Sequence, residues 1–105
     1  MTENEIKLKA VAALTGLRGG VQPDYVSDLL SEVVPTHFVV PVPADPQTIG
    51  LSVLSQLSEP LSALISGFVL AFEIIAEAYD QTDPEVPTEM LLQELALTLA
   101  REDSP

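Results

Sequence analysis

Two glutamates, Glu73 and Glu77, lie four positions apart in an otherwise apolar stretch and are the residues best spaced for chemistry. Residues four apart share one face of a helix, and paired carboxylates in apolar surroundings can shift their pKa values or bind a metal ion. A di-metal site in a helical bundle, however, needs Glu-x-x-His pairs on facing helices, and the chain has 1 histidine. We therefore interpret the pair, with Ser62 and Ser66, as the exposed polar side of a helix.

Other candidates for catalysis or metal binding are weaker. His37 has no G-x-S-x-G nucleophile motif to work with. The acidic turn Asp80–Glu85 departs from a calcium loop, because Thr82 and Pro84 occupy ligand positions. The chain has no cysteine, which excludes disulfides, thiolate metal sites and a cysteine nucleophile. We predict a non-enzymatic protein without a cofactor or metal.

The charge of the chain limits its partners. Its 16 acidic and 4 basic residues give a net charge of −12. Binding of nucleic acid or of an anionic membrane requires cations, so direct binding of nucleic acid is not expected. Acidic charge suits solubility, or docking to a basic surface of another protein. The acidic N-terminus lacks the basic start of a signal peptide, and we expect a cytoplasmic protein.

Length and composition predict a single acidic helical domain over residues 1–105. Hydrophobic residues make up 47% of the chain and charged residues 19%, which is apolar for a soluble domain. Such a composition favours an apolar surface reserved for a second copy or another protein.

The longest apolar run is Leu61–Tyr79, which we predict to be the central helix. Its charge-free part, Pro60–Phe72, is shorter than the roughly 20 residues that a bilayer requires, so no membrane span is expected. Large side chains recur at steps of three and four and are predicted to form the core: Leu61, Leu64, Ile65, Phe68, Phe72, Ile75 and Tyr79. A second row, Ala63, Gly67 and Ala71, allows another backbone to come close. That backbone could belong to the same chain, or to a second copy in a homodimer.

Four further helices complete the predicted all-α fold, a small bundle of four to five helices. Thr2, Asp45 and Thr88 are predicted N-caps, and Gly16 is a predicted helix end. Pro60 separates the third helix from the central one, unless a single kinked helix runs through it. The predicted ranges are Thr2–Leu17, Pro23–Val34, Pro46–Leu57, Glu59–Asp80 and Thr88–Arg101.

One short segment, Thr36–Pro43, has no helical character. Its valines favour an extended backbone, while its prolines cannot donate to a sheet. We expect a strap across the core, with pairing to a symmetry mate as the alternative.

These features predict a protein–protein interaction module, an adaptor or antagonist that acts through apolar helix faces and forms a homodimer. The interface candidates are Ala63, Gly67, Ala71, Val39, Val40, Val42, Leu91, Leu95 and Leu99. One alternative is an acidic inhibitor, a nucleic-acid mimic or immunity-type protein that occupies a basic site. Its acidic face would comprise Glu73, Glu77, Asp80, Asp83, Glu85 and Glu89. Another alternative is a chaperone-like holder of hydrophobic segments.

Overall fold

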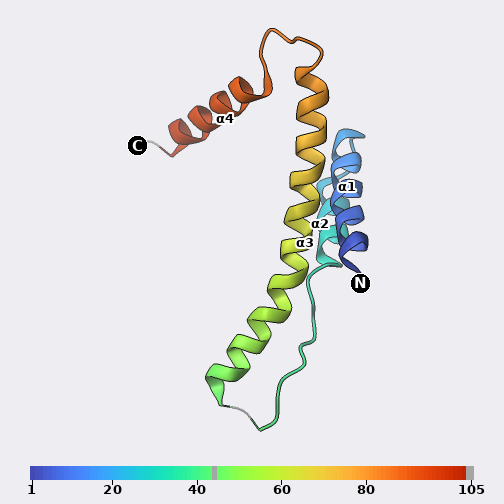
Figure 1. Cartoon of the computed structure of the whole chain (residues 1–105), viewed down its shortest axis with the longest axis vertical. Helices are drawn as coiled ribbons and strands as arrows, with labels where there is room; N and C mark the ends of the chain where they lie inside the picture. The colour runs from blue at the N-terminus through green and yellow to red at the C-terminus, as the bar shows by residue number, and fades with distance from the viewer. Residues whose placement is uncertain (44, 104–105) are drawn as a thin grey trace. The chain divides into compact units, whose positions relative to one another are not determined.

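The computed structural model describes residues 1–43 and 45–103, and over this part of the chain it contains four α-helices and no strand (Figure 1). This confirms the predicted all-α fold, and Thr36–Pro43 is the extended segment. The chain divides into two compact units, unit 1 (Met1–Leu70) and unit 2 (Ala71–Pro105). The helices are α1 (Glu3–Arg18), α2 (Pro23–Ser31), α3 (Pro46–Asp80) and α4 (Thr88–Glu102).

Helix α1 begins at the predicted cap, because the Glu5 N–H donates to Thr2 Oγ1 at 3.1 Å. Gly16 was predicted to end this helix, but it lies inside α1. Its role is in packing: a Cβ atom at Gly16 would lie 3.0 Å from Val21 Cγ2 and 3.2 Å from Tyr25 Cε1. The missing side chain therefore lets the start of α2 approach α1.

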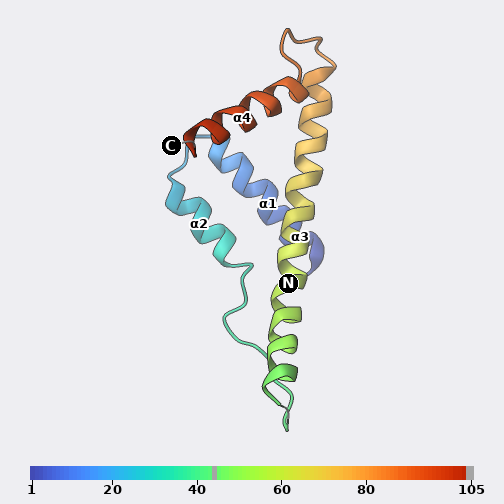
Figure 2. The same cartoon turned by 90° about the vertical axis from the view of Figure 1, so that its left-hand side faces the viewer.

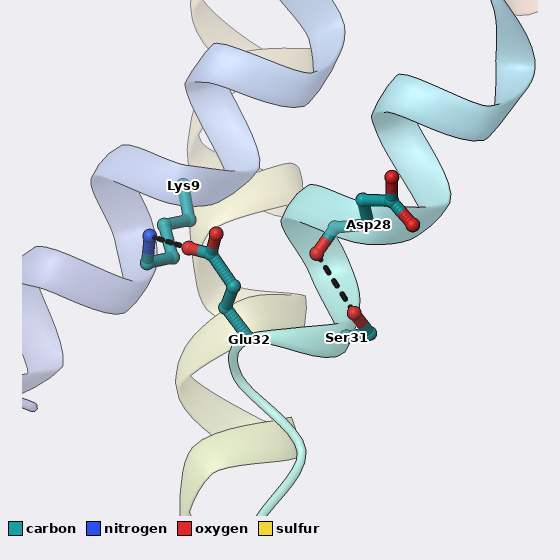
Figure 3. A network of polar contacts seen from close by, with 4 residues as sticks. All are labelled: Lys9, Asp28, Ser31 and Glu32. Carbon is teal, nitrogen blue, oxygen red and sulfur yellow. Dashed lines mark hydrogen bonds and ion pairs between the residues drawn. The ribbon is translucent and has the colours of Figure 1, made fainter.

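Helix α2 ends at Ser31, earlier than the predicted Val34. Ser31 Oγ donates to the Asp28 carbonyl at 2.8 Å, a local bond that competes with continuation of the helix. The next residue, Glu32, forms an ion pair with Lys9 of α1 (Figure 3). An ion pair this exposed contributes about 0–1 kcal/mol, so it orients α2 more than it stabilises the fold.

Helix α3 starts at the predicted cap. Asp45 Oδ1 accepts the Thr48 N–H at 2.8 Å, and Pro46 follows as the first helical residue. Hydrogen bonding from Thr48, by its side chain and its backbone N–H, holds the pKa of Asp45 below its usual value.

The predicted break between two helices at Ser58–Pro60 is wrong. α3 is continuous from Pro46 to Asp80 and contains Pro60 in its interior, which is the kinked-helix alternative. Proline has no N–H to donate to the Gln56 carbonyl, and its ring crowds that carbonyl. Figure 1 shows α3 bending in its green-to-yellow part, as expected around an interior proline.

The core of unit 1 is small and consists mostly of small side chains. Ile6 packs with Val33 and Ala63, and Leu64 covers this cluster. Ala10 and Ala13 of α1 are also buried. Figure 2 shows α1 crossing α3, and at Gly67 the two helices are so close that an added Cβ atom would lie 2.9 Å from Ala10 Cβ.

The prediction that large residues of Leu61–Tyr79 supply the core is wrong for most of them. Leu61, Leu64 and Phe68 are half-buried, whereas Ile65 is 61% exposed. Further along α3, Phe72, Ile75 and Tyr79 are also exposed. In unit 1 the reason is the closeness of α1, which selects Ala63 and Gly67 and leaves bulkier neighbours at the surface. The polar residues expected on the exposed side are indeed exposed: Ser62, Ser66, Glu73 and Glu77.

Candidate functional site

The last helix, α4, presents an apolar face that no described residue of unit 2 buries. Leucine, alanine and glutamate favour the helix, which lacks Gly and Pro. Four leucines recur at steps of three and four, share one side of α4, and are 44–54% exposed. We call them the α4 leucine face: Leu91, Leu92, Leu95 and Leu99. They include the predicted interface candidates Leu91, Leu95 and Leu99, and no residue of α4 is buried over the described residues.

The end of α3 fixes the start of α4 within unit 2. Asp80 Oδ1 accepts the Thr88 N–H at 2.8 Å and the Thr88 hydroxyl at 2.9 Å. The Tyr79 hydroxyl donates to the Val86 carbonyl at 2.8 Å across the same loop. Thr88 was predicted to cap α4 itself, but it is the first helical residue and Asp80 supplies the capping oxygen. The leucine face is therefore anchored at its N-terminal end.

The six acidic candidates are all exposed, but they are not equivalent. Asp80 is the cap of α4, and Asp83 has a φ of 57°, a left-handed conformation that aspartate tolerates. The other four, Glu73, Glu77, Glu85 and Glu89, form no ion pair with any residue that the structure describes. Both ion pairs found there, Lys7–Glu3 and Lys9–Glu32, lie in unit 1.

The extended segment is held by Gln56 of α3 as a strap beside this helix, and it does not lie across the core cluster of unit 1 as predicted. The Val39 N–H donates to Gln56 Oε1 at 2.8 Å, and Gln56 Nε2 donates back to the Val39 carbonyl at 2.6 Å. Ser52 Oγ adds a bond to the same carbonyl at 3.3 Å. Figures 1 and 2 show the strap running beside the first part of α3. The side chains of Val39 and Val42 are 81% and 90% exposed, and Val40 is also exposed.

Replacing Gln56 should release the strap. Gln56→Glu keeps the size of the side chain but removes its N–H donors, so a carboxylate would face the Val39 carbonyl. We expect the Val39 amide to lose most of its protection in hydrogen exchange, because the carboxylate repels the Val39 carbonyl and the lost hydrogen bond contributes about 0.5–1.5 kcal/mol. Gln47→Glu, at an exposed position in the same helix, is the matched control. Equal protection of Val39 in wild type and Gln56→Glu would contradict the strap contact.

Ala63 and Gly67 pack on α1 of the same chain. A Cβ atom at Gly67 would lie 2.9 Å from Ala10 Cβ and 3.0 Å from Lys7 Cα. Ala63 is buried in the core cluster. The backbone that comes close to Ala63 and Gly67 therefore belongs to the same chain, which is one of the two alternatives given for this row. Ala71, the third member of the row, belongs to unit 2 and is half-buried.

Unit 1 also contains a shallow groove that the sequence did not suggest. It has a volume of about 670 Å³ and is lined by Ile6, Val33 and Pro60 together with hydroxyl and carboxylate groups. The spacing of the serines along α3 was the available signal, since it places them on one side of the helix. The polar lining comprises Ser55, Ser58, Ser62, Ser66, Glu3, Glu32 and Glu59.

Over residues 1–43 and 45–103, no three His, Asp or Glu side chains lie close enough together to hold a metal ion. Thr36 Oγ1 lies 3.0 Å from His37 Nδ1, and both residues are exposed.

Comparison with models of protein families, with curated proteins and with solved structures found no match.

Among the described helices, α3 alone is long and apolar enough to cross a membrane, by length and composition only; its most apolar window has a mean hydropathy of 1.8. Unit 1, however, places the Lys7 backbone against Gly67 in this helix, and Lys9 lies one half-turn further along α1. A spanning α3 would carry these lysines into the bilayer, at a cost of about 2.5–3.5 kcal/mol each, or would lose α1. The expectation of no span stays a prediction, and this contact supports it.

Proposed function

We propose that the chain is a non-enzymatic protein-binding module that docks the α4 leucine face onto another protein. The observation that carries the proposal is the exposure of this face: four leucines on one side of a helix that has no buried residue in the described part of the chain. Contiguous apolar surface on a soluble protein marks an interaction site. An amphipathic helix that seats its apolar side in a groove of the partner is a common mode of recognition.

A homodimer through Ala63 and Gly67 receives less support than a different partner. α1 of the same chain occupies that part of the small row. Two copies would also each carry a charge of −12, and like charges across an interface oppose association. The proposal therefore concerns a second, different protein.

The test compares two single substitutions in α4 that add the same charge. Leu91→Asp places a carboxylate in the leucine face, whereas Gln93→Asp places one on the other side of the helix. We expect a partner captured from lysate of the source cell by the wild type to be retained by Gln93→Asp and lost by Leu91→Asp. Burial of the new carboxylate against apolar side chains of the partner should cost at least about 1 kcal/mol.

Three results contradict the proposal. Capture by both variants alike would show that the leucine face is not the docking surface. Capture that disappears at high salt but ignores Leu91→Asp would favour the acidic-inhibitor hypothesis, because salt screens exposed charges. Capture of nothing at either salt concentration would leave the module without a partner.

A further inference from the structure

Unit 2 has many more acidic than basic residues in addition to its exposed apolar face. It contains nine of the 16 acidic residues of the chain, and Arg101 is its one basic residue. Asp80 is engaged in capping α4, but the ion pairs among the described residues are confined to unit 1. The described carboxylates of unit 2 therefore form no ion pair within the unit and are available to cations of a partner.

Helix α4 contains three acidic residues, Glu89, Glu94 and Glu102, among its apolar ones. Glu94 and Glu102 border the α4 leucine face, since Glu94 lies three residues after Leu91 and Glu102 three residues after Leu99. Glu89 and Asp103 stand at its two ends. A partner must supply apolar side chains for the leucines and cations for the carboxylates around them, at helical spacing.

We infer that unit 2 binds a basic amphipathic helix of another protein. This inference rests on the proposed function and names the chemistry of the partner. Charge complementarity selects it over a second copy, which would oppose nine carboxylates with nine more. Charge complementarity also favours a basic helix over an anionic membrane, because an anionic membrane repels an acidic surface.

The probe is a synthetic 18-residue peptide of leucine and lysine, with leucines at steps of three and four and a fluorescent label. A second peptide has the same composition in scrambled order, so it keeps the charge and loses the apolar side. Fluorescence anisotropy with the full chain should show binding of the amphipathic peptide at least about tenfold tighter than the scrambled one. Leu95→Asp should weaken binding about tenfold although it adds a favourable negative charge, and Gln93→Asp should not weaken it. Raising the salt concentration should weaken the binding of wild type, because the surrounding charges are exposed.

Several results overturn the inference. Equal affinity for both peptides would mean that charge alone attracts them. Competition by neutral liposomes would assign the leucine face to a lipid surface. Leucine methyl groups of α4 that are already protected from solvent in the free protein would show that the α4 leucine face is covered. A dimer by light scattering would mean that a second copy covers it, and a monomer would mean that the same chain does.

The two proposals fail in different ways. If Leu91→Asp abolishes capture of a cellular partner but the basic peptide does not bind, the docking face stands and the charge of the partner is wrong. If neither the cellular partner nor the peptide responds to substitutions in the leucine face, both proposals are wrong.

Discussion

Alanine at Gly67 is expected to destabilise unit 1, whereas alanine at Gly50 in the same helix is expected to stabilise it. Both changes remove the conformational freedom of glycine from a helix interior, which favours folding by about 0.5–1 kcal/mol. At Gly50 a Cβ atom would meet nothing within 4 Å. At Gly67 it would lie 2.9 Å from Ala10 Cβ and 3.0 Å from Lys7 Cα, so α1 must shift.

Displacement of α1 outweighs the gain in helix propensity. Adding atoms to a packed contact costs about 1–3 kcal/mol, and here the neighbour is a helix backbone that cannot rotate away. We expect the free energy of unfolding to fall by about 1–2 kcal/mol for Gly67→Ala and to rise by up to about 1 kcal/mol for Gly50→Ala. Urea denaturation followed by circular dichroism measures both values. Similar shifts of the same sign in the two variants would mean that α1 does not pack on Gly67.

Gly67→Leu extends the test to the oligomeric state. Because the contact lies within one chain, this larger change should unfold unit 1 or separate α1 from α3. It should cause no change from dimer to monomer. Light scattering combined with circular dichroism distinguishes these results. A dimer that separates into folded monomers would assign the row to an interface between copies.

The helix starts could be predicted because their determinants are local. Thr2 and Asp45 each satisfy a backbone N–H three residues ahead, and those bonds are present. The core could not be predicted from local signals. Periodicity shows which residues share a face of a helix, but it does not show which face packs against a neighbouring helix. Here α1 selected the small row around Gly67, and Ile65 on the neighbouring side stayed exposed.

The candidate site was predictable in composition but not in its contacts. Surplus leucines in α4 indicated an unpartnered face, and Leu91, Leu95 and Leu99 lie on it. The cap from Asp80 and the strap bonds from Gln56 join residues that are distant in sequence, so no local pattern specifies them. Each was visible beforehand only as a polar residue in or beside an apolar helix.

Pro60→Ala is expected to stabilise the protein by about 2 kcal/mol. An interior proline costs a helix about 3 kcal/mol relative to alanine, because it lacks an N–H and crowds the preceding turn. Alanine would supply an N–H for the Gln56 carbonyl. Against this gain, removal of proline frees the unfolded chain and costs about 0.4–1 kcal/mol. Urea denaturation gives the net change.

Pro46→Ala is the matched control, because Pro46 is the first residue of the same helix. An N–H at that position has no partner within the helix, so the substitution should give no gain and a small loss. If Pro60→Ala and Pro46→Ala change the free energy of unfolding by the same amount, the helix is interrupted at Pro60 in solution. The two separate helices predicted from the sequence would then be correct.

Pro60 also lies between two contacts of α3. Gln56, before it, holds the strap, and Gly67, after it, receives α1. A straighter helix in Pro60→Ala changes the direction of one contact relative to the other. We therefore expect a more stable α3 accompanied by faster amide exchange at Val39, since the Gln56 bonds at 2.8 Å and 2.6 Å tolerate little displacement. Gain of helix stability with unchanged exchange at Val39 would show that the proline is not needed to align the strap.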